Sequence, residues 1–230
     1  MCEFFSFVTE PELHGGKRYY FDWKYRKAHL YEGNDSHSLI CKYYKLDEDK
    51  CNKYEYDPLR KLFKADDLHS PVNDVAQAEE WVRKLRFKRI CKPLIIKDII
   101  NPFDLPKVTK ITPEIIELLE QWGSVGDSVG GSVWGSVWDS VWNSVWGSVR
   151  GSVGDSVWGS VCDSVCDSVR DSAGVSVWAY ISSFFAIEYK YDYTSCAKLW
   201  EMGLVPSFYN KTWRLHSGKK AEVVYEREVK

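Results

Sequence analysis

A tetrapeptide repeat in the middle of the chain constrains the fold more than any other feature. Serine recurs at every fourth position from Ser124 to Ser176, fourteen times in all. The next residue is valine in thirteen of these tetrads, and the fourth position is mostly glycine or aspartate. Because each tetrad repeats the same apolar residue, the path of the backbone decides where the valines gather.

Two backbone conformations compete for this repeat, a β-solenoid and a long α-helix. An α-helix has about 3.6 residues per turn, so a valine at every fourth position drifts by about 40° per tetrad around the axis. Glycine, serine and β-branched valine also lower helix propensity. In a solenoid, each tetrad would form one short side, with valine inward and glycine or aspartate at the corner.

A second period favours the solenoid. Trp-Gly-Ser-Val begins at Trp122, Trp134, Trp146 and Trp158, so it recurs every 12 residues. Three tetrads would make one coil of a three-sided solenoid, although duplication of a 12-residue unit explains the same period. We therefore predict an α+β protein with a central tetrapeptide-repeat β-solenoid of 12 residues per coil, and a long α-helix over the repeat block is the alternative.

The sequences on both sides of the repeats predict folded segments. Thr112 and Pro113 mark a helix start, and Gly203 marks the end of a helix over residues 194–202. We also predict hairpins from residues 4–8 with 19–23 and from 213–216 with 221–226, a strand over 59–68, a short helix that runs through Tyr44, and a helix over 74–85 capped by Asn73. The predicted parts are an N-terminal α+β domain (1–110), a capping helix (111–123), the repeat block (124–179) and a C-terminal helix with a β-hairpin (180–230).

Composition argues against several classes of protein. The net charge of −2 gives no overall field for nucleic acid or a membrane surface. The seven cysteines form no Cys-x-x-Cys pair and the five histidines show no metal-site spacing, so we predict free thiols, no metal and no cofactor. The chain has no signal-like start and no apolar stretch of about 18 residues, which predicts a cytoplasmic protein without a membrane span.

The third position of the tetrad is the candidate binding surface. It holds tryptophan, arginine, cysteine or glycine, and a position that accepts arginine is expected at the surface. Exposed tryptophan is costly unless it contacts something, and tryptophan and arginine dominate interface hot spots. Packing against the flanking segments explains the tryptophans equally well. The candidate binding residues are Trp134, Trp138, Trp142, Trp146, Trp158, Arg150 and Arg170.

Other chemistry-bearing residues favour structural roles. Asp35, His37 and Ser38 are catalytic-triad residue types, but they lie within four positions on one loop, which favours a helix cap. Cys162 and Cys166 fit replaceable positions of the repeat better than a redox pair. The basic residues Arg83, Lys84, Arg86, Lys88, Arg89 and Lys92 fit a solvated helix end better than a phosphate site. We therefore assign no catalytic residue.

Several motifs outside the repeats resemble those of known sequences. They are residues 3–9 (Glu-Phe-Phe-Ser-Phe-Val-Thr), 19–23, 35–38, 52–56, 203–208 and 213–216. Together with the Ser-Val tetrads, these motifs resemble a group of uncharacterised bacteriophage and prophage proteins with Ser-Val-x-x repeats. The resemblance implies a phage or mobile-element origin and a host-cell cytoplasmic location. It implies no catalytic residue.

We therefore expect a phage-derived, non-enzymatic binding protein that presents the repeat surface to a host or phage protein or to a small ligand. Action against host defence is one purpose that fits. Two alternatives stay open. One is an enzyme or a nucleotide- or metabolite-binding protein with its pocket near His37, Tyr54 and Tyr56. The other is a structural spacer whose repeat number sets its length. The sequence does not define the oligomeric state.

Overall fold

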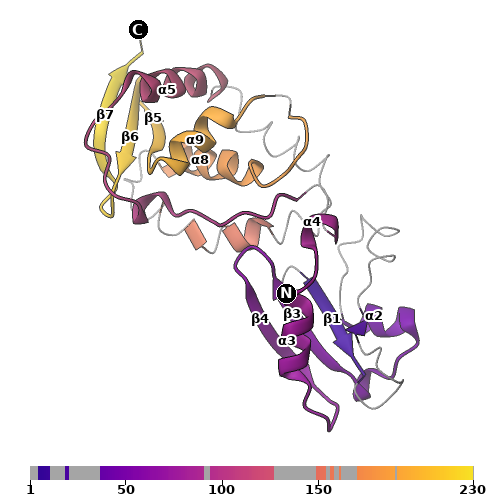
Figure 1. The fold of residues 1–230 in the computed structure, drawn as a ribbon. Helices are drawn as coiled ribbons and strands as arrows, with labels where there is room; N and C mark the ends of the chain where they lie inside the picture. The colour runs from indigo at the N-terminus through magenta and orange to yellow at the C-terminus, as the bar shows by residue number, and fades with distance from the viewer. Residues whose placement is uncertain are drawn as a thin grey trace. The chain divides into compact units, whose positions relative to one another are not determined.

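The computed structural model describes most of the chain on both sides of the repeats and several pieces of the repeats themselves. The described residues form two compact units, one that ends at Ile90 and one that begins at Leu94. Each unit contains one antiparallel sheet (Figure 1). The described residues are 5–10, 19–20, 37–90, 94–126, 149–153, 156–157, 161, 170–189 and 191–229.

The sheet of the first unit has four antiparallel strands in the order β2-β1-β3-β4. Pairing of β1 with β2 confirms the first predicted hairpin, and β4 confirms the predicted strand. β3 lies at the centre of the sheet and was not predicted, although its charged and aromatic residues alternate. The strands are β1 (Phe5–Thr9), β2 (Tyr19–Tyr20), β3 (Asn52–Asp57) and β4 (Leu62–Leu68).

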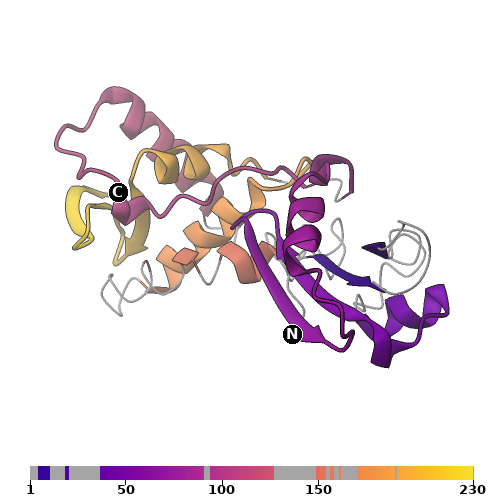
Figure 2. The same ribbon diagram turned by 60° about the horizontal axis from the view of Figure 1, so that its bottom comes forward.

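Two helices cover opposite faces of this sheet. Phe7 contacts Trp81 of α3 (Val75–Arg83), with ring centroids 5.0 Å apart. Its neighbour Val8 packs with Ile40 of α2 (His37–Tyr44) on the other face. Successive residues of a strand point to opposite faces, so α2 and α3 lie on different sides, as both views show (Figures 1 and 2).

Local signals locate the helix starts of this unit to within one residue. The Asn73 side chain accepts a hydrogen bond from the backbone N–H of Val75 at 3.2 Å, but the N-cap residue of α3 is Asp74, so the predicted cap is one residue early. α2 confirms the short helix predicted through Tyr44. Three short helices complete the assignments in the two units: η1 (Glu48–Lys50), α4 (Phe87–Ile90) and η2 (Pro102–Asp104).

The sheet of the second unit has three antiparallel strands in the order β5-β6-β7. The pairing of β6 with β7 confirms the second predicted hairpin. Helix α8 packs on β5 and on α9, and α5 packs on α9. The elements are α5 (Pro113–Gly126), α8 (Arg170–Ser182), α9 (Thr194–Glu201), β5 (Val205–Tyr209), β6 (Thr212–Ser217) and β7 (Glu222–Glu228).

The predicted ends of these helices are confirmed. Thr112 Oγ1 accepts a hydrogen bond from Ile115 N–H at 3.4 Å at the start of α5. Gly203 follows α9 with φ of +82°, the left-handed conformation that ends many helices. In the described part of the chain, no helix has both the length and the apolar character needed to cross a membrane.

The predicted β-solenoid is wrong. Residues 124–126 belong to the end of α5, residues 149–153, 156–157 and 161 are helical, and the last tetrads form the start of α8. Among the residues of the block that the structure describes, none is in a strand. Every described piece of the repeat is therefore helical, as the alternative conformation requires.

Burial explains why the helix wins at these positions despite poor propensity. Val149, Val153, Val157 and Val161 are each at most 1% exposed. All four valines are buried although a period of four drifts by about 40° per tetrad, whereas of the neighbouring serines Ser152 is buried and Ser156 is exposed. Burial of one valine, worth roughly 1.5–3 kcal/mol, offsets the summed propensity deficit of the four residues of its tetrad, each of which costs up to about 1 kcal/mol.

We expect Val177→Ala in α8 to lower the free energy of unfolding by about 2 kcal/mol, because Val177 is fully buried. Val175→Ala is the matched control, because Val175 lies in the same helix and is only half-buried. Urea denaturation of both variants measures the difference. Equal losses at the two positions would contradict the burial of one helical face.

His216 makes part of the stability of the second unit depend on pH. Its Nδ1–H donates to Ala221 O at 3.1 Å, and its Nε2 accepts from Ser207 Oγ at 2.7 Å. Burial lowers the pKa of His216 below its ordinary value of 6.5, and the charge of Arg214 acts in the same direction, whereas Glu226 opposes it. The unfolded chain therefore binds the proton more readily than the folded chain.

We expect the free energy of unfolding to decrease as the pH falls below 6.5, because protonation then favours the unfolded chain. His216→Gln should remove this part of the decrease between about pH 7 and pH 5.5, measured by urea denaturation. His69→Gln, at an exposed position of the first unit, serves as the control. A full decrease in the His216 variant would assign the pH dependence to other groups.

Candidate functional site

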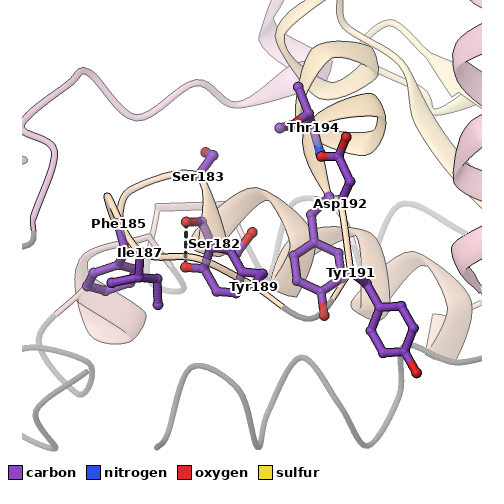
Figure 3. A pocket seen from close by; sticks show the side chains of 10 residues that line it. Ser182, Ser183, Phe185, Ile187, Tyr189, Tyr191, Asp192 and Thr194 are labelled. Atoms are coloured by element: carbon purple, nitrogen blue, oxygen red, sulfur yellow. Dashed lines mark hydrogen bonds between the residues drawn. The ribbon is translucent and has the colours of Figure 1, made fainter. Parts of the chain in front are cut away.

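A pocket of about 350 Å³ opens in the second unit between the end of α8 and the start of α9. Figure 3 shows its lining, which comes from the last turn of α8, the connecting segment and the first turn of α9. The lining residues are Ser182, Ser183, Phe185, Ile187, Tyr189, Tyr191, Asp192, Tyr193, Thr194 and Ala197.

Three tyrosines at alternate positions of the connecting segment dominate this lining. Tyr189 donates its hydroxyl to the backbone oxygen of Ser182 at 2.8 Å, the dashed line in Figure 3. Its ring meets that of Tyr193 edge to face, with centroids 5.4 Å apart. Burial raises the pKa of both tyrosines above the ordinary value, so both hydroxyls are neutral at physiological pH.

The Tyr193 hydroxyl is an unsatisfied polar group. Tyr193 is 3% exposed, and its hydroxyl oxygen has no hydrogen-bond partner among the residues that the structure describes. A buried hydroxyl without a partner costs roughly 1–3 kcal/mol. A ligand that offers one hydrogen bond to this atom would recover that cost on binding.

Asp192 gives the pocket its charge. Its Oδ1 accepts the backbone N–H of Thr194, the first residue of α9, at 2.8 Å. Hydrogen bonds from Thr194 hold the pKa of Asp192 below its ordinary value, so the carboxylate is ionised. Among the described residues that line the pocket, none is positively charged. The lining therefore combines aromatic rings, hydroxyls and one negative charge.

The repeat residues predicted to bind a partner are only partly described. Arg150 is exposed, and its guanidinium lies 5.4 Å from the centroid of the Trp178 ring. Arg170 is the first residue of α8. Neither arginine is among the described residues that line the pocket. The remaining candidates lie outside the described residues: Trp134, Trp138, Trp142, Trp146 and Trp158.

The other chemistry-bearing residues of the sequence mostly occupy structural positions. Ser38 donates to Glu48 at 2.8 Å, and Arg83 pairs with Glu79 one turn away in α3 at 2.7 Å. His37 lies at the start of α2, and its Nε2 is 3.0 Å from the backbone oxygen of Tyr54. Outside the described residues lie Asp35, Lys92, Cys162 and Cys166.

The two tyrosines of the alternative pocket near His37 are packed in the interior of the first unit. Tyr54 donates its hydroxyl to Asp74 Oδ1 at 2.6 Å, and Asn52 Nδ2 donates to the same oxygen at 2.8 Å. Tyr56 packs against Phe87 at 5.3 Å between centroids. This network ties β3 to the start of α3, which is a structural role.

Sequence reasoning missed the pocket although one signal was present. Tyr189, Tyr191 and Tyr193 alternate immediately before Thr194, the predicted start of a helix. Alternation places like side chains on one side of an extended segment. The alternation gives no indication that the end of α8, a helix that begins in the repeat block, forms the other side of the pocket.

Comparisons with protein-family models, curated proteins and solved structures found no match to this chain. The fold and the pocket are therefore interpreted from geometry and chemistry alone. The resemblance of the sequence to phage proteins stays a prediction.

A pair of tyrosine variants tests the hydrogen bonding in the pocket. Tyr193→Phe should leave the free energy of unfolding unchanged or raise it by about 1 kcal/mol, because it removes an unpartnered buried hydroxyl. Tyr189→Phe should lower it by about 1 kcal/mol, because the Ser182 carbonyl loses its donor. Urea denaturation compares the two. A loss at Tyr193 as large as that at Tyr189 would mean that the Tyr193 hydroxyl has a partner.

Proposed function

We propose that this protein is a non-enzymatic binding protein that holds a small organic cation in the tyrosine pocket of its second unit. The observation that carries the proposal is the lining itself: three tyrosines, a phenylalanine and an ionised Asp192, with no positive charge among the described lining residues. Aromatic rings attract cations through the negative potential of their faces.

The neighbouring structure uses the same chemistry. The Lys97 ammonium lies 4.9 Å from the centroid of the Phe184 ring and 5.3 Å from that of Tyr180. Contacts of this kind are worth roughly 0.5–2 kcal/mol, depending on how far the cation is desolvated. The pocket volume of about 350 Å³ lies near the lower end for ligand sites, which suits a small quaternary or primary ammonium compound.

A binding role fits the lining better than catalysis. Histidine, cysteine and lysine, the usual general bases and nucleophiles, are missing from the described lining residues. The serine hydroxyls of the lining donate to backbone oxygens one turn back, Ser182 to Ala179 and Ser183 to Tyr180, each at 2.6 Å. The one carboxylate of the described lining, Asp192, accepts from Thr194 N–H, and no hydrogen bond joins it to either serine among the described residues.

The repeat block adds a second surface to this proposal on sequence grounds. The Trp134, Trp138, Trp142, Trp146 and Trp158 positions would meet a host or phage protein. The phage origin and the cytoplasmic location are part of the same proposal and rest on the sequence resemblance. The exposed position of Arg150 supports a surface role for the third position of the tetrad.

Choline and its uncharged isostere 3,3-dimethylbutanol test the cation preference by isothermal titration calorimetry. We expect choline to bind more tightly, because the isostere has the same shape without the charge. Asp192→Asn should weaken choline binding about fivefold, since it removes the charge and keeps the oxygen that accepts from Thr194 N–H. Glu188→Gln is the matched control, because Glu188 lies in the same segment, is exposed and does not line the pocket.

Equal affinities for choline and the isostere would contradict the proposed cation site. So would equal effects of the Asp192 and Glu188 variants, because a general surface charge would then explain the binding. Tyr193→Phe adds a second readout, since a ligand that hydrogen-bonds the buried hydroxyl loses affinity in that variant.

A further inference from the structure

We propose that the first unit binds a divalent transition-metal ion through His37, Glu55 and Asp66. One ligand atom from each of these residues lies within 4.8 Å of the other two. The three side chains come from α2, β3 and β4. Small movements of the side chains would bring them to the distances of metal ligands, about 2.0–2.2 Å from the ion.

A β-bulge brings Asp66 toward this group. β4 pairs with β3 through Ala65 opposite Tyr54 and through Asp67 opposite Lys53. Asp66 is therefore the extra residue of the bulge, with no partner position on β3. Bulges of this kind redirect a side chain and are frequent beside functional sites. Here the bulge places the Asp66 carboxylate next to Glu55. In a strand without the bulge, this carboxylate would lie at a different distance from Glu55.

The orientation of His37 suits a metal ligand. Its Nε2 lies 3.0 Å from the backbone oxygen of Tyr54, so the Nε2–H donates to that carbonyl. This bond leaves the lone pair on Nδ1, which lies 3.7 Å from Asp66 Oδ2. Ligating histidines in proteins are generally oriented in this way, with the second ring N–H bound to a carbonyl or a carboxylate.

Burial of Glu55 requires a positive partner. The Glu55 side chain is 2% exposed, and an ionised carboxylate at such a position needs a cation close by. The Lys64 ammonium lies 3.5 Å from Glu55 Oε2 and 2.8 Å from Asp66 Oδ1. The Lys64 side chain is 55% exposed, so it can move into solvent when a metal ion replaces its charge.

Ser6 provides an independent indication of a ligand. It lies directly opposite Glu55 in the pairing of β1 with β3, so the two side chains share one face of the sheet. Its hydroxyl is buried, at 3% exposure of the residue, and has no hydrogen-bond partner in the described part of the chain. A water molecule bound to a metal ion beside Glu55 would satisfy this hydroxyl.

One imidazole and two carboxylates define the class of metal. This mixed nitrogen and oxygen set suits Zn²⁺ or Mn²⁺ and leaves further coordination positions for water. The sequence pattern gave no hint of the site and predicted no metal, because the three ligands are distant in sequence and show no short spacing. The proposal concerns the first unit and does not depend on the tyrosine pocket.

Calorimetric titration of the chelator-treated full-length chain with Zn²⁺ and with Mn²⁺ tests the site. We expect one site per chain. Asp66→Asn and Glu55→Gln should each weaken binding by at least about tenfold, since each removes a ligand charge. Asp67→Asn is the matched control, because Asp67 is the next residue of β4 and pairs with Lys53 and His69 instead. Circular dichroism confirms that each variant is folded.

Lys64→Met separates a metal site from an ordinary ion-pair network. If Lys64 competes with the metal for the same two carboxylates, its removal should tighten metal binding by about tenfold. Looser binding in this variant would overturn the proposal. Absence of binding in the unaltered chain would overturn it too, as would Zn²⁺ binding that the Asp66 variant leaves unchanged, which would point to the cysteines.

Discussion

In the second unit, the side chains of Tyr180 and Trp200 both form hydrogen bonds with the backbone of Ile100. The Tyr180 hydroxyl accepts from Ile100 N–H and Trp200 Nε1–H donates to Ile100 O, each at 2.8 Å. The two rings stack with centroids 4.9 Å apart, and burial raises the pKa of Tyr180 to about 12. These contacts join the last turns of α8 and α9 through one backbone position, and the tyrosine pocket lies between the last turn of α8 and the first turn of α9.

The two proposed sites follow from one physical situation, a polar group buried on a packed surface. In the pocket it is the Tyr193 hydroxyl, and on the sheet of the first unit it is the Glu55 carboxylate with Ser6 beside it. Burial makes an incompletely satisfied polar group costly, so such groups persist where a ligand or counterion satisfies them. The aromatic face of the same sheet contrasts with this, since the Tyr54 hydroxyl there is bonded to Asp74.

Local signals predicted the ends of elements well. Thr112 caps α5 and Gly203 ends α9 as expected, and the cap of α3 is Asp74, one residue after the predicted Asn73. Each of these effects depends on hydrogen bonds or dihedral angles within one turn. The repeat block was predicted wrongly as a solenoid. Its 12-residue period was interpreted as one turn of a three-sided β-solenoid, whereas the described valines are buried on helices. Duplication of a 12-residue unit is the remaining explanation of that period.

The sequence by itself determined the α+β class, the second hairpin and the places where the flanking helices begin and end. Only the tertiary structure decided that the described tetrads are helical, because propensity disfavours the helix there and the burial of the valines is not visible in the sequence. It also decided which side chains meet. His37, Glu55 and Asp66 belong to three elements, and the pocket joins residues on both sides of a loop. Such groupings depend on long-range packing, which short sequence patterns do not record.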